Sequence, residues 1–356
     1  MSSKQAFIIL TPGFPESESD STCLPMQQQF VRALKKMHPE LEIVVLTFQY
    51  PYHQKSYKWF GLTVIPFGGR NKGGLQKFIL RNKVNSTLRK VYQEKKIAGL
   101  LSFWYNECAY VGKKFADKYG LKHCCWILGQ DAKKANKYPR LLPPRPGELV
   151  ALSDFIQNEF QRNHEIKPAS VIPPGVDETL LSNMQEPKDI DILGVGSLIP
   201  LKQYDIFLEI VAEIKKQLPE IKVLLVGKGP EKRRLQSLTG RFDLHNNLTM
   251  PGELPYREVL KVMHRAKILL HPSAYEGFSG VCMEALCAGT HVISFCKPMN
   301  TDIAHWHIVK AKQEMLKEAL TILKQPGTDY QPVLAYTAGN SVKQVMNLFG
   351  ISGKVR

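Results

Sequence analysis

The sequence contains no long apolar run. None of its hydrophobic stretches reaches the roughly 18 uncharged residues that a membrane-spanning helix requires, so no such helix is expected. The first segment, MSSKQAFIILTPGFP, has an apolar centre that is too short for a signal peptide and is typical of a first β-strand. The sequence therefore predicts a cytoplasmic globular protein.

Paired cysteines of the kind that hold zinc or build a disulfide framework are missing. The seven cysteines are scattered without a Cys-x-x-Cys pair, and Cys124 and Cys125 are adjacent, which favours reduced, packed thiols. Two nucleotide-binding motifs are missing as well. GVGSLI and GKGPEK lack the third glycine of G-x-G-x-x-G, and no G-x4-G-K-[ST] occurs. A dinucleotide oxidoreductase and a P-loop enzyme are therefore disfavoured.

Acidic residues are scarce in the first half of the chain. The whole chain has 48 Lys and Arg against 32 Asp and Glu, a net charge of +16. Residues 1–175 hold 26 of the basic and 13 of the acidic residues, and residues 55–96 hold 11 basic residues and one acidic residue. This positive field suits phosphates, anionic lipid or an acidic acceptor, although a solvated surface is the simpler interpretation of any single lysine. Aromatic residues are not interleaved as in RNA-binding signatures, so nucleic acid is not expected as a partner.

Apolar runs alternate with amphipathic segments, which predicts an α/β protein with parallel sheets. A length of 356 residues suits two domains better than one. Strands are expected in the first half at 6–10, 42–48, 62–67, 97–104, 123–128 and 148–153, with a helix near 25–38. Strands are expected in the second half at 189–198, 222–230, 267–273 and 291–295, with a helix over 203–217.

A Pro-Pro-Gly turn within KPASVIPPGVDETL, residues 167–180, indicates the change of domain. We therefore expect an N-terminal domain over 1–173 and a C-terminal domain over 174–338. A helix within the last segment, 339–356, is expected to pack back on the N-terminal domain.

The segment HPSAYEGFSGVCMEALCAGTHVISF, residues 271–295, places two carboxylates beside a helix start. A helix is predicted over 281–288. Gly280 would let a ligand approach the backbone, whose free N–H groups bind anions without a basic side chain. Glu276 and Glu284 flank this position, and carboxylates accept hydrogen bonds from hydroxyl groups.

A nucleotide diphosphate sugar satisfies all these elements, because it has a central diphosphate between a ribose and a hexose. The alternative is structural. An ionised carboxylate in an apolar segment is costly without a partner, so Glu284 would pair with a buried Lys or His, and Glu276 would cap the helix. The residues alone leave both interpretations open.

The pattern P-S-x-x-E-G-F-x-x-V-x-x-E-A-L-x-x-G-x-x-V-I resembles the E-x7-E signature of the GT4-like retaining glycosyltransferases, also described as glycosyl transferases group 1. Four more segments resemble family blocks in the same order: VIPPGVD, LGVGSLIPLKQYDIFLE, LLVGKGPEKRRL and LTMPGELPYREVLKVMHRAKILLHPS. The resemblance is strong over residues 165–295 and weaker at TPGFPESES. It implies the α/β fold called GT-B, with two Rossmann-like domains that face each other across a cleft.

The resemblance also implies roles for single residues. Glu276 would hold hydroxyl groups of the donor sugar, Glu284 would hold the ribose, and Lys202 would neutralise the departing diphosphate. Gly13 would lie under the phosphates from the N-terminal domain, and Leu254 would contact the base. The other donor-binding residues that it implies are Gly196, Ser197, Lys228, Phe278, Ser279, Gly280 and Val281.

Three positions depart from the family pattern. Ser197 replaces the arginine of a Gly-Arg pair, so Lys202 would carry more of the phosphate charge, helped by Lys228. Leu128 stands where the N-terminal domain of many members has a histidine, which leaves Asp131 as a candidate contact to the acceptor or the sugar. Ser279 replaces a common glycine but is small.

The family's favoured mechanism is a same-face substitution in which the departing phosphate oxygen takes the acceptor proton. It needs electrostatic support of the diphosphate more than a strong protein base, so no metal and no cofactor are expected. The DID segment at 189–191 resembles a metal-binding D-x-D motif, but it opens a predicted strand and is expected to face solvent.

Residues 55–96 combine basic charge with apolar side chains, as in proteins that rest on anionic lipid headgroups. In GT-B enzymes this region commonly shapes the acceptor site. The alternative is that the apolar residues are core and the lysines are solvated. The predicted acceptor or membrane contacts are Trp59, Arg70, Lys72, Lys77 and Arg81.

The sequence thus predicts a retaining hexosyltransferase that uses a UDP- or GDP-linked sugar and a lipid-linked or anionic glycan acceptor. It would act in cell-surface polysaccharide or glycolipid synthesis, as a cytoplasmic protein with peripheral contact to an anionic membrane. A non-catalytic nucleotide-sugar-binding protein of the same fold is the alternative, because of Ser197 and Leu128.

Overall fold

The computed structural model describes residues 5–177, 179 and 186–351. The chain divides into two compact units. Unit 1 comprises Met1–Gly175 and Ala338–Arg356, and unit 2 comprises Val176–Thr337. The boundaries expected from the sequence fall within two residues of these divisions. The last five residues of the expected segment 339–356 lie outside the described residues.

In the described part of unit 1, one eight-stranded sheet has the order β3-β4-β2-β1-β5-β6-β7-β8. The β3·β4 pair is antiparallel and the other pairs are parallel. The strands are β1 (Ala6–Gly13), β2 (Glu42–Tyr50), β3 (Tyr57–Trp59), β4 (Leu62–Pro66), β5 (Ile97–Phe103), β6 (His123–Ile127), β7 (Leu149–Ala151) and β8 (Ser170–Val171). The helices are α1 (Pro25–Met37), α2 (Gly74–Glu94), α3 (Glu107–Tyr119), α4 (Tyr138–Leu141), α5 (Asp154–His164) and α11 (Ala338–Leu348).

In the described part of unit 2, a six-stranded, wholly parallel sheet has the order β11-β10-β9-β12-β13-β14. The strands are β9 (Ile190–Val195), β10 (Val223–Val226), β11 (Leu248–Gly252), β12 (Ala266–His271), β13 (His291–Ser294) and β14 (Trp306–Ile308). The helices are α6 (Tyr204–Lys215), α7 (Lys232–Arg241), α8 (Tyr256–Arg265), α9 (Gly280–Cys287) and α10 (Lys312–Lys324), and the 3-10 turn η4 (Pro200–Lys202) precedes α6.

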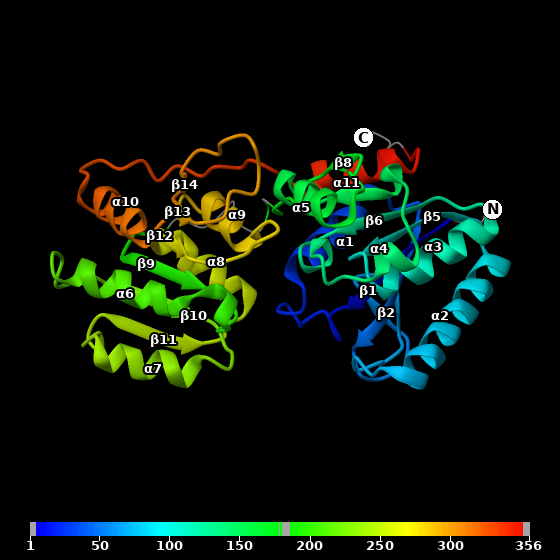
Figure 1. The fold of residues 1–356 in the computed structure, drawn as a ribbon, viewed down its shortest axis with the longest axis horizontal. Helices are drawn as coiled ribbons and strands as arrows, with labels where there is room; N and C mark the ends of the chain where they lie inside the picture. Colours follow the sequence, from blue (N-terminus) through cyan, green and yellow to red (C-terminus); the bar gives the residue numbers. More distant parts are fainter. Residues whose placement is uncertain (1–4, 178, 180–185, 352–356) are drawn as a thin grey trace. The chain divides into compact units, whose positions relative to one another are not determined.

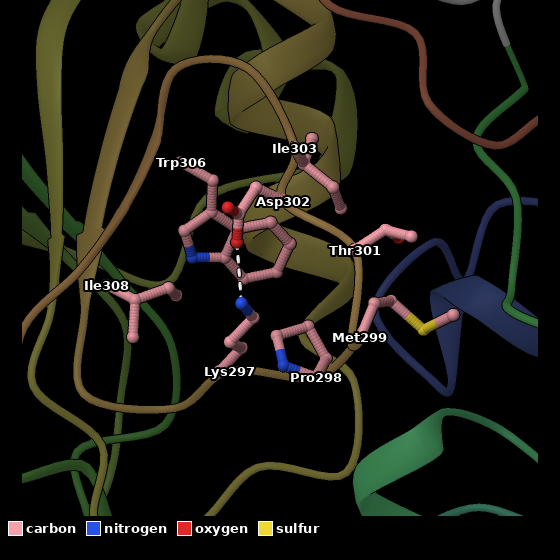
Figure 2. Close-up of a pocket in the computed structure, with 8 residues that line it drawn as sticks. All are labelled: Lys297, Pro298, Met299, Thr301, Asp302, Ile303, Trp306 and Ile308. Carbon is pink, nitrogen blue, oxygen red and sulfur yellow. Dashed lines mark hydrogen bonds and ion pairs between the residues drawn. The ribbon is translucent and has the colours of Figure 1, made fainter.

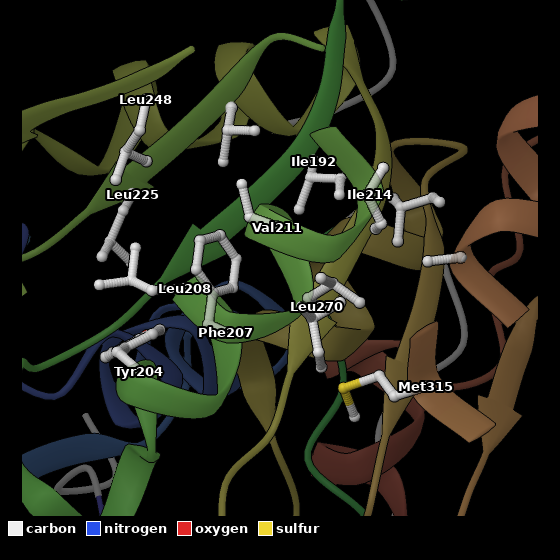
Figure 3. Close-up of a cluster of buried hydrophobic side chains, with 14 of the residues drawn as sticks. Ile192, Tyr204, Phe207, Leu208, Val211, Ile214, Leu225, Leu248, Leu270 and Met315 are labelled. Atoms are coloured by element: carbon white, nitrogen blue, oxygen red, sulfur yellow. The ribbon is translucent and has the colours of Figure 1, made fainter. Parts of the chain in front are cut away.

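The core of unit 2 lies where helix α6 packs on the sheet. Apolar residues recur on one face of α6 at spacings of three and four residues, which is the helical period. Phe207 and Val211 on this face are fully buried, and they belong to the same cluster as Ile192 of β9 and Leu225 of β10 (Figure 3). Tyr204, at the first position of α6, forms one edge of this cluster (Figure 3).

The last helix, α11, belongs to unit 1 although it follows all of unit 2 in the sequence (Figure 1). It packs against α1. Just beyond it, the Phe349 ring meets the Phe7 ring edge to face, with centroids 4.9 Å apart. A Cβ atom on Gly99 would lie 2.3 Å from Cδ1 of Phe349. The absence of a side chain at Gly99 therefore makes room for the Phe349 ring against the sheet.

The chain passes between the units at two neighbouring points. In unit 2, Val176 forms a parallel bridge with Thr337, and its N–H group donates to the Tyr336 carbonyl at 3.1 Å. In unit 1, the Ser341 hydroxyl donates to the Pro173 carbonyl at 2.7 Å. The segments by which the chain enters and leaves unit 2 therefore lie side by side. Among the described residues, none of the helices combines the length and apolar character that a membrane crossing requires.

Candidate active site

Helix α9 begins just after the loop that carries Glu276. Strand β12 ends at His271, and Gly280 is the first residue of α9. The Ser279 hydroxyl caps the helix by accepting a hydrogen bond from the Cys282 N–H group at 3.4 Å. First-turn N–H groups have no carbonyl partner within their own helix. With the helix dipole, they favour an anion at this end.

Glu276 is bound by two side chains from elsewhere in unit 2. Its carboxylate forms an ion pair with Lys202 and accepts a hydrogen bond from Nε2 of His271 at 3.1 Å. Burial opposes its ionisation, but the hydrogen bond from His271 and the charge of Lys202 lower the pKa of Glu276 to about 2. Burial lowers the pKa of His271, so this imidazole is neutral and donates through Nε2. Glu276 is therefore an ionised acceptor at neutral pH.

Glu284, on α9, shares a hydrogen bond with the start of α8. Its Oε1 atom accepts from the Tyr256 hydroxyl at 2.7 Å. Burial and the neighbouring charge of Glu284 raise the pKa of Tyr256, so the phenol stays protonated and donates. This contact differs from the Lys or His partner that the structural interpretation expects. It fixes one oxygen of a buried carboxylate and joins the beginnings of two helices.

Two glycines bring the ends of β9 and β10 together. Gly196 and Gly227 have φ angles of 149° and 151°, which L side chains rarely adopt. A Cβ atom on Gly227 would lie 1.9 Å from the carbonyl oxygen of Gly196, and one on Gly196 would lie 2.9 Å from the Tyr204 hydroxyl oxygen. Both turns therefore require glycine. Ser197, which follows Gly196, is exposed.

Lys228 and Leu254 lie on the loops beside this turn. The Lys228 carbonyl accepts a hydrogen bond from the Leu198 N–H group at 2.9 Å, which places Lys228 next to the turn after β9. Its exposed ammonium group forms an ion pair with Glu253. Leu254 follows and is half-buried. The charge of Lys228 is thus shared with Glu253 rather than held by the backbone turn alone.

Two small recesses lie beside Trp306. One, of about 180 Å³, is lined by His271, Glu276, Ser279, Ser294, Cys296, Pro298 and Trp306. The other, of about 220 Å³, shares Pro298 and Trp306 and lies at the loop between β13 and β14 (Figure 2). The Trp306 indole donates to the Ser294 hydroxyl at 2.9 Å, and its ring meets Phe278 edge to face at 6.2 Å. Trp306 therefore supports the loop that leads into α9.

Residues 179–328 match the sequence profile of a family described as glycosyl transferases group 1. The chain carries a group 1 glycosyltransferase domain. This domain falls within unit 2. The chain is 29% identical over 127 residues to a phosphatidylinositol N-acetylglucosaminyltransferase protein of Homo sapiens. That alignment covers 35% of the chain and 26% of the relative, so it spans about a quarter of the length of the human protein.

Solved structures resemble the whole chain, including unit 1. The lipopolysaccharide outer core galactosyltransferase WaaB superposes with a TM-score of 0.69 at 13% identity, covering 97% of this chain and 99% of WaaB. Alr3699/HepE of Anabaena, solved with UDP and glucose, superposes with a TM-score of 0.66 at 15% identity and 97% coverage of both chains. The GT-B fold of two Rossmann-like units, expected from the sequence, is confirmed.

Two sequence-predicted contacts lie in unit 1, outside the group 1 domain. Gly13 is buried at the end of β1. Asp131 is 5% exposed, and its carboxylate accepts hydrogen bonds from the N–H groups of Tyr105, Leu128 and Gly129 at 2.7 to 3.3 Å. Burial raises the pKa of Asp131 to about 6 in spite of these bonds. The expected substrate contact is therefore corrected: Asp131 holds the loop after β6 together.

Trp59 is not an exposed membrane contact, contrary to the prediction. Its side chain is 0% exposed, and its indole donates to the Ser17 carbonyl at 3.2 Å. The ring meets Phe14 edge to face at 4.8 Å. The alternation within the short strand β3 explains the error, since Lys58 points to solvent and Trp59 points to the core. Trp59 therefore braces the loop that follows β1.

The basic residues around α2 divide into two groups. Arg70 and Lys72 are exposed. Lys77 and Arg81 instead face Glu107, with Nζ of Lys77 3.9 Å and Nε of Arg81 2.7 Å from Oε1 of that residue. These two cations are thus already paired within unit 1, which reduces their value as acceptor contacts.

The DID segment is engaged in the sheet of unit 2. Asp189 forms a bidentate ion pair with Arg265 at 2.7 and 2.8 Å. Asp191 accepts from Nζ of Lys267 at 2.7 Å and from the Lys222 N–H group at 2.8 Å. In the part of the chain that the structure describes, no group of three His, Cys, Asp or Glu is arranged to hold a metal ion. These carboxylates stabilise the start of β9.

Three side chains of the site were not predicted from the sequence. His271 ends a buried strand five positions before Glu276, and a histidine so placed next to a predicted carboxylate was a usable signal. Tyr256 gave no such signal, because 28 positions separate it from Glu284 and only the folded chain brings them together. Tyr204 gave none either, because its hydroxyl meets Gly196 only through the turn that precedes α6.

Proposed function

We propose that this protein is a retaining glycosyltransferase that moves a hexose from a nucleotide diphosphate sugar to a lipid-linked or anionic glycan acceptor, without a metal or cofactor. One observation carries the proposal. Two buried carboxylates, Glu276 and Glu284, flank the start of α9, and Lys202 is held against the first of them. Hydroxyl acceptors on either side of an anion site are what such a donor requires.

Each group of the site has a task that follows from its chemistry. The diphosphate would lie against the first-turn N–H groups of α9, where Lys202 neutralises the charge that grows on the leaving oxygen. Glu276 would exchange Lys202 for hydroxyl groups of the hexose, and Glu284 would accept from the ribose. The bond between the sugar C1 and the phosphate oxygen breaks as the acceptor oxygen bonds C1 on the same face. The acceptor proton passes to the departing phosphate oxygen.

The named relatives support a nucleotide-sugar donor. The human relative is named as an N-acetylglucosaminyltransferase, and the Anabaena structure contains UDP and glucose. A uridine diphosphate sugar is therefore the first donor to test, with guanosine and adenosine diphosphate sugars beside it.

An exposed apolar group at the start of α2 supports a lipid-linked acceptor. Leu75, Phe78 and Ile79 are 74%, 60% and 45% exposed. Arg70 and Lys72 precede them and are exposed. Apolar side chains beside basic ones are suited to the boundary between acyl chains and anionic headgroups. We assign peripheral membrane contact to this surface, the α2 start surface, in place of buried Trp59.

Isosteric substitution of the two carboxylates tests the donor site. Glu276→Gln and Glu284→Gln keep the side-chain volume but remove the charge, so each is expected to lower turnover of the donor at least about a hundredfold, the size of a lost transition-state contact of this kind. Release of nucleoside diphosphate from UDP-, GDP- and ADP-sugars, with and without a glycolipid acceptor panel, is the measurement.

A matched control comes from the same unit. Glu258 on α8 is half-exposed and pairs with Lys261, so Glu258→Gln should leave turnover unchanged. Full activity of both Glu276→Gln and Glu284→Gln would contradict the site. Donor binding by the unmodified protein without any release of nucleoside diphosphate would instead favour a non-catalytic nucleotide-sugar-binding protein, the alternative that Ser197 and Leu128 raise.

A further inference from the structure

A buried hydroxyl group without a partner lies at the edge of the donor site. Tyr204 is 3% exposed. Its hydroxyl oxygen is buried and has no hydrogen-bond partner among the described residues. A Cβ atom on Gly196 would lie 2.9 Å from this oxygen and 3.7 Å from Cε of Lys202. The hydroxyl therefore converges with Gly196 and Lys202, two residues of the proposed donor site.

We propose that the Tyr204 hydroxyl is a further ligand-binding group of this site and donates a hydrogen bond to a phosphate oxygen of the nucleotide diphosphate. This inference rests on the proposed function and names a contact that the sequence motif does not contain. The partner it requires is an acceptor oxygen that enters with the ligand.

The unpaired hydroxyl is the main reason for this assignment. A buried polar group without a hydrogen bond is costly, and most such groups in native proteins are paired. The carboxylate nearest in charge, Glu276, is already bound to Lys202 and His271. Since a cost of this kind is tolerated at sites of function, the hydroxyl fits a group that is satisfied when ligand binds.

The position of the hydroxyl is fixed by the core beneath it. The Tyr204 ring belongs to the buried cluster of unit 2 (Figure 3). It meets the Phe207 ring edge to face, with centroids 6.0 Å apart. A donor on a rigid aromatic side chain loses little conformational freedom when it binds, which favours tight and specific contact.

The chemistry of the group also suits an anionic partner. Burial and the charge of Glu276 raise the pKa of Tyr204, so the phenol is a protonated donor at neutral pH. The exposed Ser197 stands where related sequences place an arginine. When the diphosphate draws Lys202 away from Glu276, the stem of Lys202 leaves the space next to Gly196, and the phenol gains a phosphate oxygen as its partner.

The test removes the hydroxyl and nothing else. Tyr204→Phe in the full chain is titrated with uridine, guanosine and adenosine diphosphates by calorimetry. For each nucleotide that the unmodified protein binds, the dissociation constant is expected to rise roughly ten- to hundredfold, the range for a hydrogen bond to a charged group. The melting temperature is expected to stay equal or to rise, because an unpaired buried hydroxyl is lost.

Tyr105→Phe is the matched control, since it makes the same chemical change at a paired hydroxyl. The Tyr105 hydroxyl donates to the Leu142 carbonyl at 2.5 Å in unit 1. This variant should melt at a lower temperature and bind nucleotide as the unmodified protein does.

Two outcomes would overturn the assignment of Tyr204, and they are distinct from failure of the proposed function. Unchanged nucleotide affinity in Tyr204→Phe would do so, and a lowered melting temperature with unchanged affinity would show that the hydroxyl is structural. If the unmodified protein bound none of the three diphosphates, the donor site itself would be refuted.

Discussion

His123 is a buried base that the proposed chemistry does not use. It lies on β6, where its Nε2 atom is 2.9 Å from the Ser102 hydroxyl, and among the described residues its Nδ1 atom has no hydrogen-bond partner. Burial lowers the pKa of His123 to about 3, and the charge of Lys113 acts in the same direction. The folded protein therefore keeps His123 neutral at a pH where the unfolded chain protonates it.

This difference predicts how stability changes on acidification. The pKa of a histidine in the unfolded chain is about 6.5, above the folded value, so the stability contribution is present above that pH and is lost as the pH falls. Between about pH 6 and pH 4 the loss from this one residue approaches about 1.4 kcal/mol per pH unit. His123→Gln removes the titration and should flatten the dependence. Urea unfolding of unit 1 at pH 7.5 and pH 4.5 measures it.

The comparison must be made between slopes and not between absolute stabilities, because Gln also changes the contact with Ser102. His245 is an exposed histidine in unit 2, so His245→Gln is the control and should keep the original pH dependence. Equal slopes for His123→Gln and the unmodified protein would contradict the buried-base explanation.

At the scale of single residues, the sequence indicated which groups matter but not what they touch. Glu276 and Glu284 are identified by a local pattern, since the helix between them sets their spacing. Lys202 and Tyr256 reach these carboxylates from segments 74 and 28 positions away. Trp59 and Asp131 were misassigned for the same reason: whether an indole or a carboxylate is buried depends on neighbours that lie far along the chain.

Among the elements, α11 has a larger effect on unit 1 than its position in the sequence suggests. Phe349 is 9% exposed and lies between Phe7 and Gly99. Phe349→Ala should destabilise unit 1 by about 3 kcal/mol through lost burial and the cavity that remains. Gly99→Ala should cost about 1 to 3 kcal/mol, because its methyl group would overlap the Phe349 ring. Denaturant unfolding of both variants measures these losses.

The double variant makes the test specific. With Phe349 truncated, the methyl group of Gly99→Ala no longer overlaps a ring and partly fills the cavity, so the two losses should not add. Strictly additive losses would show that Phe349 and Gly99 do not share one contact. Leu348, next to Phe349 in the chain, is less buried, and Leu348→Ala should have little effect on the same measurement.

The elements themselves were mostly predictable. The strands of both sheets and helices α1 and α6 follow from runs of apolar residues or from the helical period. The short antiparallel strand β3 was missed because three residues are too few to show alternation. Helix α2 was treated only as a basic segment, since its buried residues Leu80, Val84, Leu88 and Val91 occupy a single stripe and exposed apolar residues precede them.

For the whole molecule, the uneven charge predicts membrane binding that depends on salt. The α2 start surface belongs to the half of the chain that holds 26 basic against 13 acidic residues. The protein should sediment with vesicles that contain phosphatidylglycerol at low salt and less so at high salt, because mobile ions screen exposed charges. Leu75→Ser with Phe78→Ser should reduce binding roughly tenfold, since two exposed apolar side chains no longer enter the headgroup region.

Leu334→Ser provides the control, because Leu334 is 42% exposed and lies in unit 2. It should bind vesicles as the unmodified protein does. Absence of binding at either salt concentration would end the membrane proposal, and so would equal losses in the control and the α2 variants. Neither result would affect the donor site, which is tested by nucleotide binding.

The paired chain crossings also make the molecule separable. Because Val176 lies beside Thr337, the segment between them starts and finishes at one place. A single gene fragment therefore encodes the whole group 1 domain, and the ends left in its host are held close by the contact between Pro173 and Ser341. The domain is an insert that can be exchanged between related proteins at one junction, so donor and acceptor preferences can be recombined without redesigning either sheet.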